Sequence, residues 1–163
     1  MKKSISTLLL FAAAFLFAAC GGDNSNTSTS QISTGETSES SEANGNPSYD
    51  PDRGEGKFKE VEMAANVDQA MVTEGKKIVD VKCSACHKLT NEKLVGPGWS
   101  GVTGRHKPAW IMNFITNTDE MLNKDPMAQA QLEICLVRMP NQSLSDNDAR
   151  NLLEFMRFND GVK

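Results

Sequence analysis

The five residues Cys83-Ser84-Ala85-Cys86-His87 are the most informative stretch of this 163-residue chain. The pattern Cys-x-x-Cys-His is typical of covalent haem attachment. Two thiols at this spacing can each form a thioether with a vinyl group on one edge of a porphyrin, and the histidine that follows then reaches the iron from one face. The sequence therefore predicts one covalent haem c, attached at Cys83 and Cys86, with His87 as an iron ligand.

Three other interpretations of these cysteines explain less of the sequence. A thioredoxin-like redox pair needs a nearby βαβ pattern, and none is visible. A structural zinc site needs four ligands, and only Cys135 and His106 remain as candidates without a second paired motif. A disulfide between Cys83 and Cys86 leaves His87 unexplained.

The first twenty residues have the pattern of an export signal. Lys2 and Lys3 precede an apolar run over residues 8–17, which is too short to span a bilayer comfortably. Residues 16–20, Leu-Phe-Ala-Ala-Cys, resemble a bacterial lipoprotein signal, although Phe17 stands where leucine is commoner. The resemblance implies a signal peptide over residues 1–19, lipidation of Cys20, and an exported protein that is anchored to a bacterial membrane and faces the periplasm. An ordinary signal, cleaved near Ala19, is the alternative.

Residues 20–60 are expected to form the lipidated cysteine and a flexible low-complexity linker. From Gly21 to Ser48 the chain is mostly Ser, Thr, Asn, Gly and Glu, with Ile32 as its one large apolar residue. Such a segment cannot bury enough apolar surface to offset the entropy cost of ordering it. The stretch from Tyr49 to Glu60 contains Pro51, Gly54 and Gly56 and many charged residues, and it is also expected to stay loose. A flexible linker of about 40 residues spans roughly 35 Å, so it would keep a domain close to a membrane.

Residues 61–163 are predicted to form one all-α domain. Helical periodicity indicates helices over residues 68–82, 108–116 and 125–137, and a last helix that begins after Ser145. In the last helix, apolar residues recur at the i, i+3, i+4, i+7 spacing of an amphipathic helix. No alternating strand pattern is visible. A folded part of this size has a small core, which a large apolar cofactor would enlarge.

Residues from about Thr73 to Phe158 resemble class I (monohaem) cytochromes c. Gly75 lies eight residues before Cys83, where that family keeps a glycine for close contact between its first and last helices. The loop over residues 96–105, Gly-Pro-Gly-Trp-Ser-Gly-Val-Thr-Gly-Arg, resembles the loop that follows the haem motif. Met139-Pro140 resembles the segment that carries the distal ligand. The three motifs occur in the family's order, so the resemblance implies helices wrapped around one haem.

The resemblance also implies roles for four further residues. Met139 would be the second iron ligand, and the Pro97 carbonyl would accept a hydrogen bond from the second ring nitrogen of His87. Arg105 would pair with a haem propionate, and Trp99, where the family usually has leucine, would wall the haem. Each has an alternative: a loop turn for Pro97, a solvent-exposed charge for Arg105 and ordinary packing for Trp99.

Several residues near these motifs carry other expectations. The competing methionines, which helix packing would explain, are Met112, Met121, Met127 and Met156. Trp110, like Trp99, is a candidate to wall the haem or bond a propionate. His106 is expected to be a surface histidine, and Cys135 an inert buried thiol.

These expectations favour an electron-transfer protein over an enzyme. The predicted function is a membrane-tethered one-electron carrier of a respiratory chain, in which iron cycles between Fe(III) and Fe(II) with His/Met ligation. The alternatives are a haem-based gas-binding or sensor domain with a labile distal methionine, and a structural lipoprotein without haem. A terminal oxidase or a nitrogen-oxide reductase is a partner by family analogy alone. The net charge of −4 does not favour nucleic acid.

Overall fold

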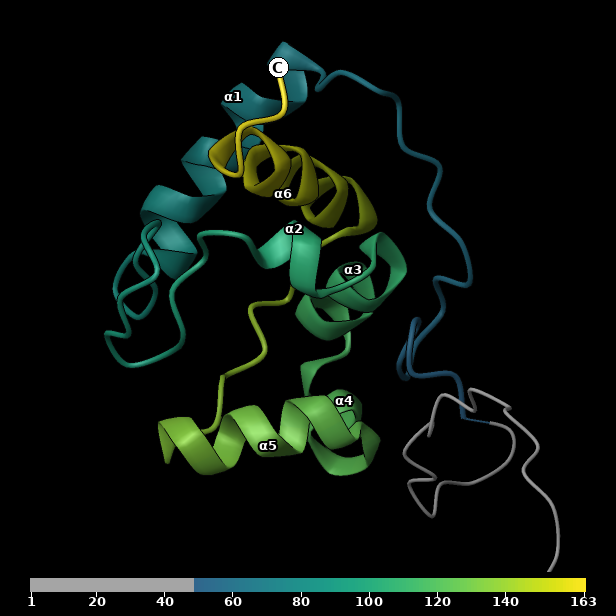
Figure 1. Ribbon diagram of the computed structural model, residues 1–163, viewed down its shortest axis with the longest axis vertical. Coiled ribbons are helices and arrows are strands. Elements are labelled where there is room, and N and C mark those ends of the chain that lie inside the picture. Colours follow the sequence, from purple (N-terminus) through teal and green to yellow (C-terminus); the bar gives the residue numbers. More distant parts are fainter. Residues whose placement is uncertain (1–48) are drawn as a thin grey trace, which may run out of the picture. The chain divides into compact units, whose positions relative to one another are not determined.

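The computed structural model describes residues 49–163, and over this range the chain forms helices and no strand (Figure 1). The elements are α1 (Gln69–Ile78), the π-helical turn η1 (Val79–Cys83), α2 (Val102–Arg105), α3 (Pro108–Thr116), α4 (Thr118–Lys124), α5 (Pro126–Cys135) and α6 (Asp146–Asn159). The all-α prediction is confirmed. None of the helices in this range is long and apolar enough to cross a membrane. The predicted signal peptide, Cys20 and the linker up to residue 48 lie outside the described residues.

Local capping explains where the main helices begin. The Asp68 side chain accepts hydrogen bonds from the amides of Ala70 and Met71, which have no partner inside α1. Pro108 starts α3, where its missing N–H costs nothing. Ser145 and Asp148 form a capping box at the start of α6, which begins after Ser145 as expected.

Two helix boundaries differ from the prediction. The helix expected over residues 68–82 changes at Val79 into η1, a wider turn that ends at Cys83, the first residue of the haem motif. The helix expected to reach residue 137 ends at Cys135, because Leu136 adopts a left-handed conformation with φ of 59°. The short helix α4 was not predicted, because its seven residues show too little apolar periodicity.

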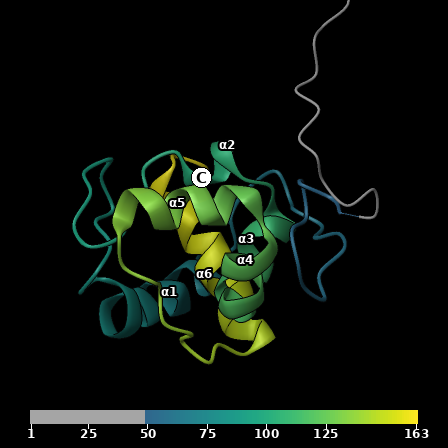
Figure 2. The same cartoon turned by 90° about the horizontal axis from the view of Figure 1, so that it is seen from below.

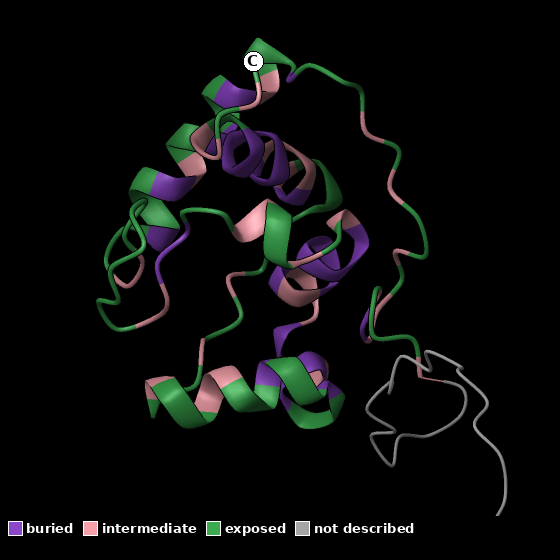
Figure 3. Ribbon diagram, viewed as in Figure 1, coloured by how far each residue is buried: buried purple, intermediate pink, exposed green. Residues whose placement is uncertain are grey.

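The core lies where α1 and α3 pack on α6, whose middle residues are almost all buried (Figures 1 and 3). Gly75 allows α1 and α6 to approach closely, since a Cβ atom there would lie 2.3 Å from the Asn151 carbonyl oxygen and 2.8 Å from the Phe155 Cβ. Helices α4 and α5 lie on the side of α3 that faces away from α1 and α6 (Figure 1; seen from below in Figure 2). Side chains of α3, α5 and the haem-motif loop line a cavity between these elements.

The stretch from Tyr49 to Glu60, expected to be loose, instead packs against the helices. Asn113 of α3 is fully buried, and its Nδ2 donates to the carbonyls of Arg53 and Phe58, each at 2.9 Å. Its Oδ1 accepts from the Phe58 amide at 3.0 Å. Asn113 thus satisfies backbone groups of Arg53 and Phe58 in a segment that forms no helix or strand of its own. We call residues 49–66 the strap, which runs along one side of the helices before α1 (Figure 1).

Asp125 fastens the beginning of the strap. This carboxylate is fully buried, and it accepts hydrogen bonds from the Tyr49 hydroxyl, from Trp110 Nε1 at 2.9 Å and from the Ala128 amide at 2.7 Å. Burial and this bond raise the pKa of Tyr49 well above its ordinary value, so the phenol stays protonated and keeps donating. One residue therefore caps α5, orients a tryptophan of α3 and holds the strap.

Candidate haem site

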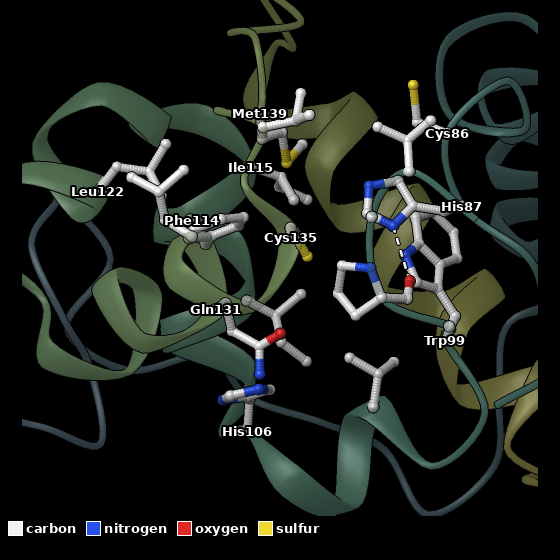
Figure 4. A pocket seen from close by; sticks show the side chains of 18 of the residues that line it. Cys86, His87, Trp99, His106, Phe114, Ile115, Leu122, Gln131, Cys135 and Met139 are labelled. Carbon is white, nitrogen blue, oxygen red and sulfur yellow. Dashed lines mark hydrogen bonds between the residues drawn. The ribbon is translucent and has the colours of Figure 1, made fainter. Parts of the chain in front are cut away.

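A cavity lies between the haem-motif loop, α3, α5 and the segment that precedes α6, with an empty volume of about 1060 Å³ that includes its opening to solvent (Figure 4). Its walls are mainly apolar, as in most cofactor sites. The apolar lining includes Val95, Val102, Ile111, Phe114, Ile115, Leu122, Leu132 and Val137. Of the sequence-predicted site residues, the cavity brings together Cys86, His87, Pro97, Trp99, Arg105 and Met139.

His87 is held in an orientation that suits metal binding. Its Nδ1 lies 2.9 Å from the Pro97 carbonyl oxygen, the contact drawn in Figure 4 and expected from the sequence. A carbonyl only accepts, so Nδ1 carries the proton and Nε2 keeps a free lone pair for iron. Burial lowers the pKa of His87, although the Pro97 bond opposes this shift, so the neutral ring that metals require is favoured.

Gly96 leaves the room that this ring needs. A Cβ atom at residue 96 would lie 2.4 Å from the Cε1 atom of His87 and 2.8 Å from its Nδ1. The ring also lies beside Trp99, with 5.4 Å between ring centroids and 37° between the planes. Trp99 is 6% exposed, so it walls the cavity next to His87, as expected.

The two cysteines of the motif occupy different environments. Both are free thiols, and Cys86 lines the cavity while Cys83 is buried at the end of η1. Burial raises the pKa of Cys83 to about 11, so this thiol is protonated at neutral pH. The backbone turns back at the motif, where the amides of Cys86 and His87 both donate to the Cys83 carbonyl. This turn places the histidine beside the thiol that lines the cavity.

Met139 reaches the cavity from the segment between α5 and α6 (Figure 4). Among residues 49–163, the other methionine that lines it is Met156 of α6, which is also packed in the core. Met112 and Met121 are buried elsewhere in the core, and Met127 is 39% exposed on α5. The five candidates from the sequence are therefore reduced to two, of which only Met139 lies outside a helix.

Arg105 and Trp110 line the cavity, and both also donate hydrogen bonds within the protein. Arg105 donates through Nη1 to the Ser100 carbonyl at 2.6 Å and through Nη2 to the Gly98 carbonyl at 3.2 Å. Its guanidinium thus braces the loop that carries Trp99. The Trp110 indole donates to Asp125, as described above.

Two residues line the cavity against expectation. His106, predicted to be a surface histidine, stacks on Trp110 with 3.9 Å between ring centroids and 11° between planes. Cys135, predicted to be an inert buried thiol, is partly exposed and lines the cavity from the last turn of α5. The i, i+4 spacing of Gln131 and Cys135 on an amphipathic helix is the signal that could have indicated this shared face.

The described residues fit a haem better than a structural metal ion. Within residues 49–163, no three His, Cys, Asp or Glu side chains come close enough together to hold a metal. The cavity instead brings together the oriented imidazole of His87, the thioether of Met139, the thiol of Cys86 and apolar walls, which are groups that suit a c-type haem.

Comparisons with known proteins agree with this geometry. The Cytochrome c family matches residues 72–159. A solved structure, cytochrome c from Rhodothermus marinus, is 30% identical, with a TM-score of 0.62 over 64% of this chain and 90% of that chain. An engineered form of the same protein, bound to a carbene intermediate, has a TM-score of 0.59 at the same identity and coverage. No curated protein matches significantly. The family match spans more than half of the chain, so the chain belongs to the cytochrome c family, which implies covalent haem c and haem-based electron transfer.

Proposed function

We propose that this protein is a monohaem cytochrome that carries one electron at a time while tethered to a membrane. Its haem would be attached at Cys83 and Cys86, with His87 and Met139 as axial ligands. The observation that carries the proposal is the Pro97-oriented ring of His87 in an apolar cavity that Met139 also lines.

The residues around the cavity suit outer-sphere electron transfer. Bound haem supplies a one-electron Fe(III)/Fe(II) couple. The Pro97 bond holds the His87 ring and increases its basicity as a ligand. The thioether of Met139 is soft and neutral, so it favours the ferrous state and raises the reduction potential. The apolar walls exclude water, and unchanged ligation keeps the reorganisation on electron transfer small.

The first test is whether haem is bound covalently. After acid-acetone extraction, the haem is expected to remain with the denatured polypeptide, because thioether bonds survive unfolding. Replacing both Cys83 and Cys86 with alanine is expected to make the haem extractable or absent. Cys135→Ala is the matched control, since this third free thiol lies outside the motif, and it should retain haem. Complete extraction of haem from the unchanged protein would contradict the proposal.

The proposed tether rests on the leader and on Cys20. Acylation at Cys20 would add several chains, which anchor a protein stably where one chain binds only marginally. The protein would then face the periplasm, and an acceptor such as a terminal oxidase or a nitrogen-oxide reductase remains part of the proposal by analogy.

Cys20→Ser is expected to release the protein from membranes without changing its visible spectrum, because Cys20 lies far along the chain from the haem site. Fractionation followed by absorption spectroscopy measures both properties. Cys135→Ser should stay in the membrane fraction. If Cys20→Ser remains membrane-bound, the tether is not at this residue.

A further inference from the structure

His106 contains a buried polar atom that the protein leaves without a partner. Among side-chain nitrogen and oxygen atoms of residues 49–163, its Nδ1 is the one that is buried and makes no hydrogen bond. Such an atom destabilises the folded protein when it stays unpaired. Native proteins usually satisfy it, and an exception points to a bound group.

The ring of His106 is held in place by its surroundings. It stacks on Trp110, which stacks in turn on Phe114 with 5.1 Å between ring centroids and 4° between planes. Trp110 is fixed at its other end by Asp125, and the His106 backbone amide donates to the Val102 carbonyl. The ring therefore cannot easily turn away to find another partner.

His106 differs from its neighbours in having a buried ring nitrogen with no partner. Trp110 gives its one N–H to Asp125, and Arg105 gives two of its five N–H groups to loop carbonyls. His106 lines the same cavity as His87 and Met139 (Figure 4). The polar groups of a haem are its two propionate carboxylates, and a carboxylate accepts a hydrogen bond from an imidazole N–H.

We propose that His106 donates its Nδ1–H to a haem propionate and takes up a proton when the iron is reduced. This inference rests on the haem binding proposed above. In the coupled step, one electron passes from a reductant to the iron and one proton passes from water to the imidazole. Reduction removes one positive charge from the site, so the imidazolium form is more stable beside ferrous than beside ferric haem.

The groups around His106 shift its pKa in both directions. Burial, and then the neighbouring charge of Arg105, lower the pKa of His106, whereas the charge of Asp125 raises it. A propionate at hydrogen-bond distance would raise it further. The pKa of His106 is thus expected to be higher in the ferrous protein than in the ferric protein. Between these two values, the reduction potential should fall as pH rises, and it should be flat on either side.

The test is potentiometry of the haem-loaded protein between about pH 5 and pH 8, the range in which histidine titrates. His106→Asn keeps an N–H donor near the position of Nδ1 but cannot titrate. His106→Phe keeps an aromatic ring on Trp110 but loses both donor and titration. Both variants are expected to lose the pH dependence of the potential, and only His106→Phe should also lower the melting temperature of the haem-loaded protein, because the propionate then loses its donor.

A second readout is NMR of ring-labelled histidine in the ferrous protein. A slowly exchanging His106 N–H, and a pKa higher than in the ferric protein, are expected. If the unchanged protein shows a reversible haem couple with a flat potential, or if His106→Phe keeps the full pH dependence, the inference is wrong while the proposed function stands. A protein without haem would overturn both.

Discussion

Met139→Ala is expected to remove the weak sulfur-to-iron charge-transfer band of the ferric protein and to lower its reduction potential clearly. The thioether that stabilises ferrous iron is lost. The choice of axial ligands changes the reduction potential of haem proteins over roughly 0.8 V, so the effect should be large. The haem should stay attached, because Cys83, Cys86 and His87 are unchanged. The ferrous variant should also bind carbon monoxide, since one face of the iron is open. Absorption spectroscopy and potentiometry measure these effects.

Met156 is the matched control, because it is the other methionine that lines the cavity. It is 3% exposed, so Met156→Ala should destabilise the protein by about 2–5 kcal/mol. Met156→Leu should cost less than about 1.5 kcal/mol and should leave the band intact. If a Met156 variant loses the band while Met139→Ala keeps it, the ligand assignment is wrong. Tight binding of carbon monoxide by the unchanged protein would favour the gas-binding alternative.

Gly75→Ala is expected to destabilise the fold by about 3 kcal/mol or more, because the added Cβ would press on the Asn151 carbonyl of α6. Backbone cannot rotate aside as a side chain can, so α1 and α6 must separate. For a domain of this size, the melting temperature should fall by on the order of 10 °C or more. Thermal unfolding of the haem-loaded protein, followed by circular dichroism, measures the change.

Gly104→Ala is the control for helix propensity. Gly104 lies in α2, and a Cβ atom there would meet no atom within 4 Å. Alanine loses less backbone entropy on folding, so this variant should be neutral or up to about 1 kcal/mol more stable. If the two variants unfold at the same temperature, close packing at Gly75 does not hold the helices together.

The features that could be predicted from the sequence depend on neighbouring residues. The turn from Cys83 to His87 is set by five consecutive residues, and the capping by Asp68 and Ser145 acts over three. The requirement for a small residue at Gly75 was predicted by family resemblance, and the structure supplies its physical reason. The bond between His87 and Pro97 spans ten residues and was likewise expected only from the resemblance.

The features that could not be predicted depend on contacts between distant residues. The strap has too few apolar residues to suggest packing, and it is ordered because Asn113 and Asp125 bond it from more than 50 residues away. His106 is only four residues from Trp110, but their stacking depends on the bend between α2 and α3, which helical periodicity does not predict. Composition describes what a segment can bury by itself, and it does not describe hydrogen bonds that another segment offers.

The strap also affects the choice of the N-terminal boundary for a truncated form of this domain. The region that matches the family begins at residue 72, so a fragment designed on that boundary would lack the whole strap. In such a fragment, the amide of Asn113 and the carboxylate of Asp125 would lose hydrogen-bond partners. Apolar surface that the strap covers would also be exposed to water. Arg157 of α6 would lose the Ala64 carbonyl, to which it donates at 2.6 Å. The smallest autonomous module for transplantation into other proteins, or onto an electrode, therefore begins at Tyr49.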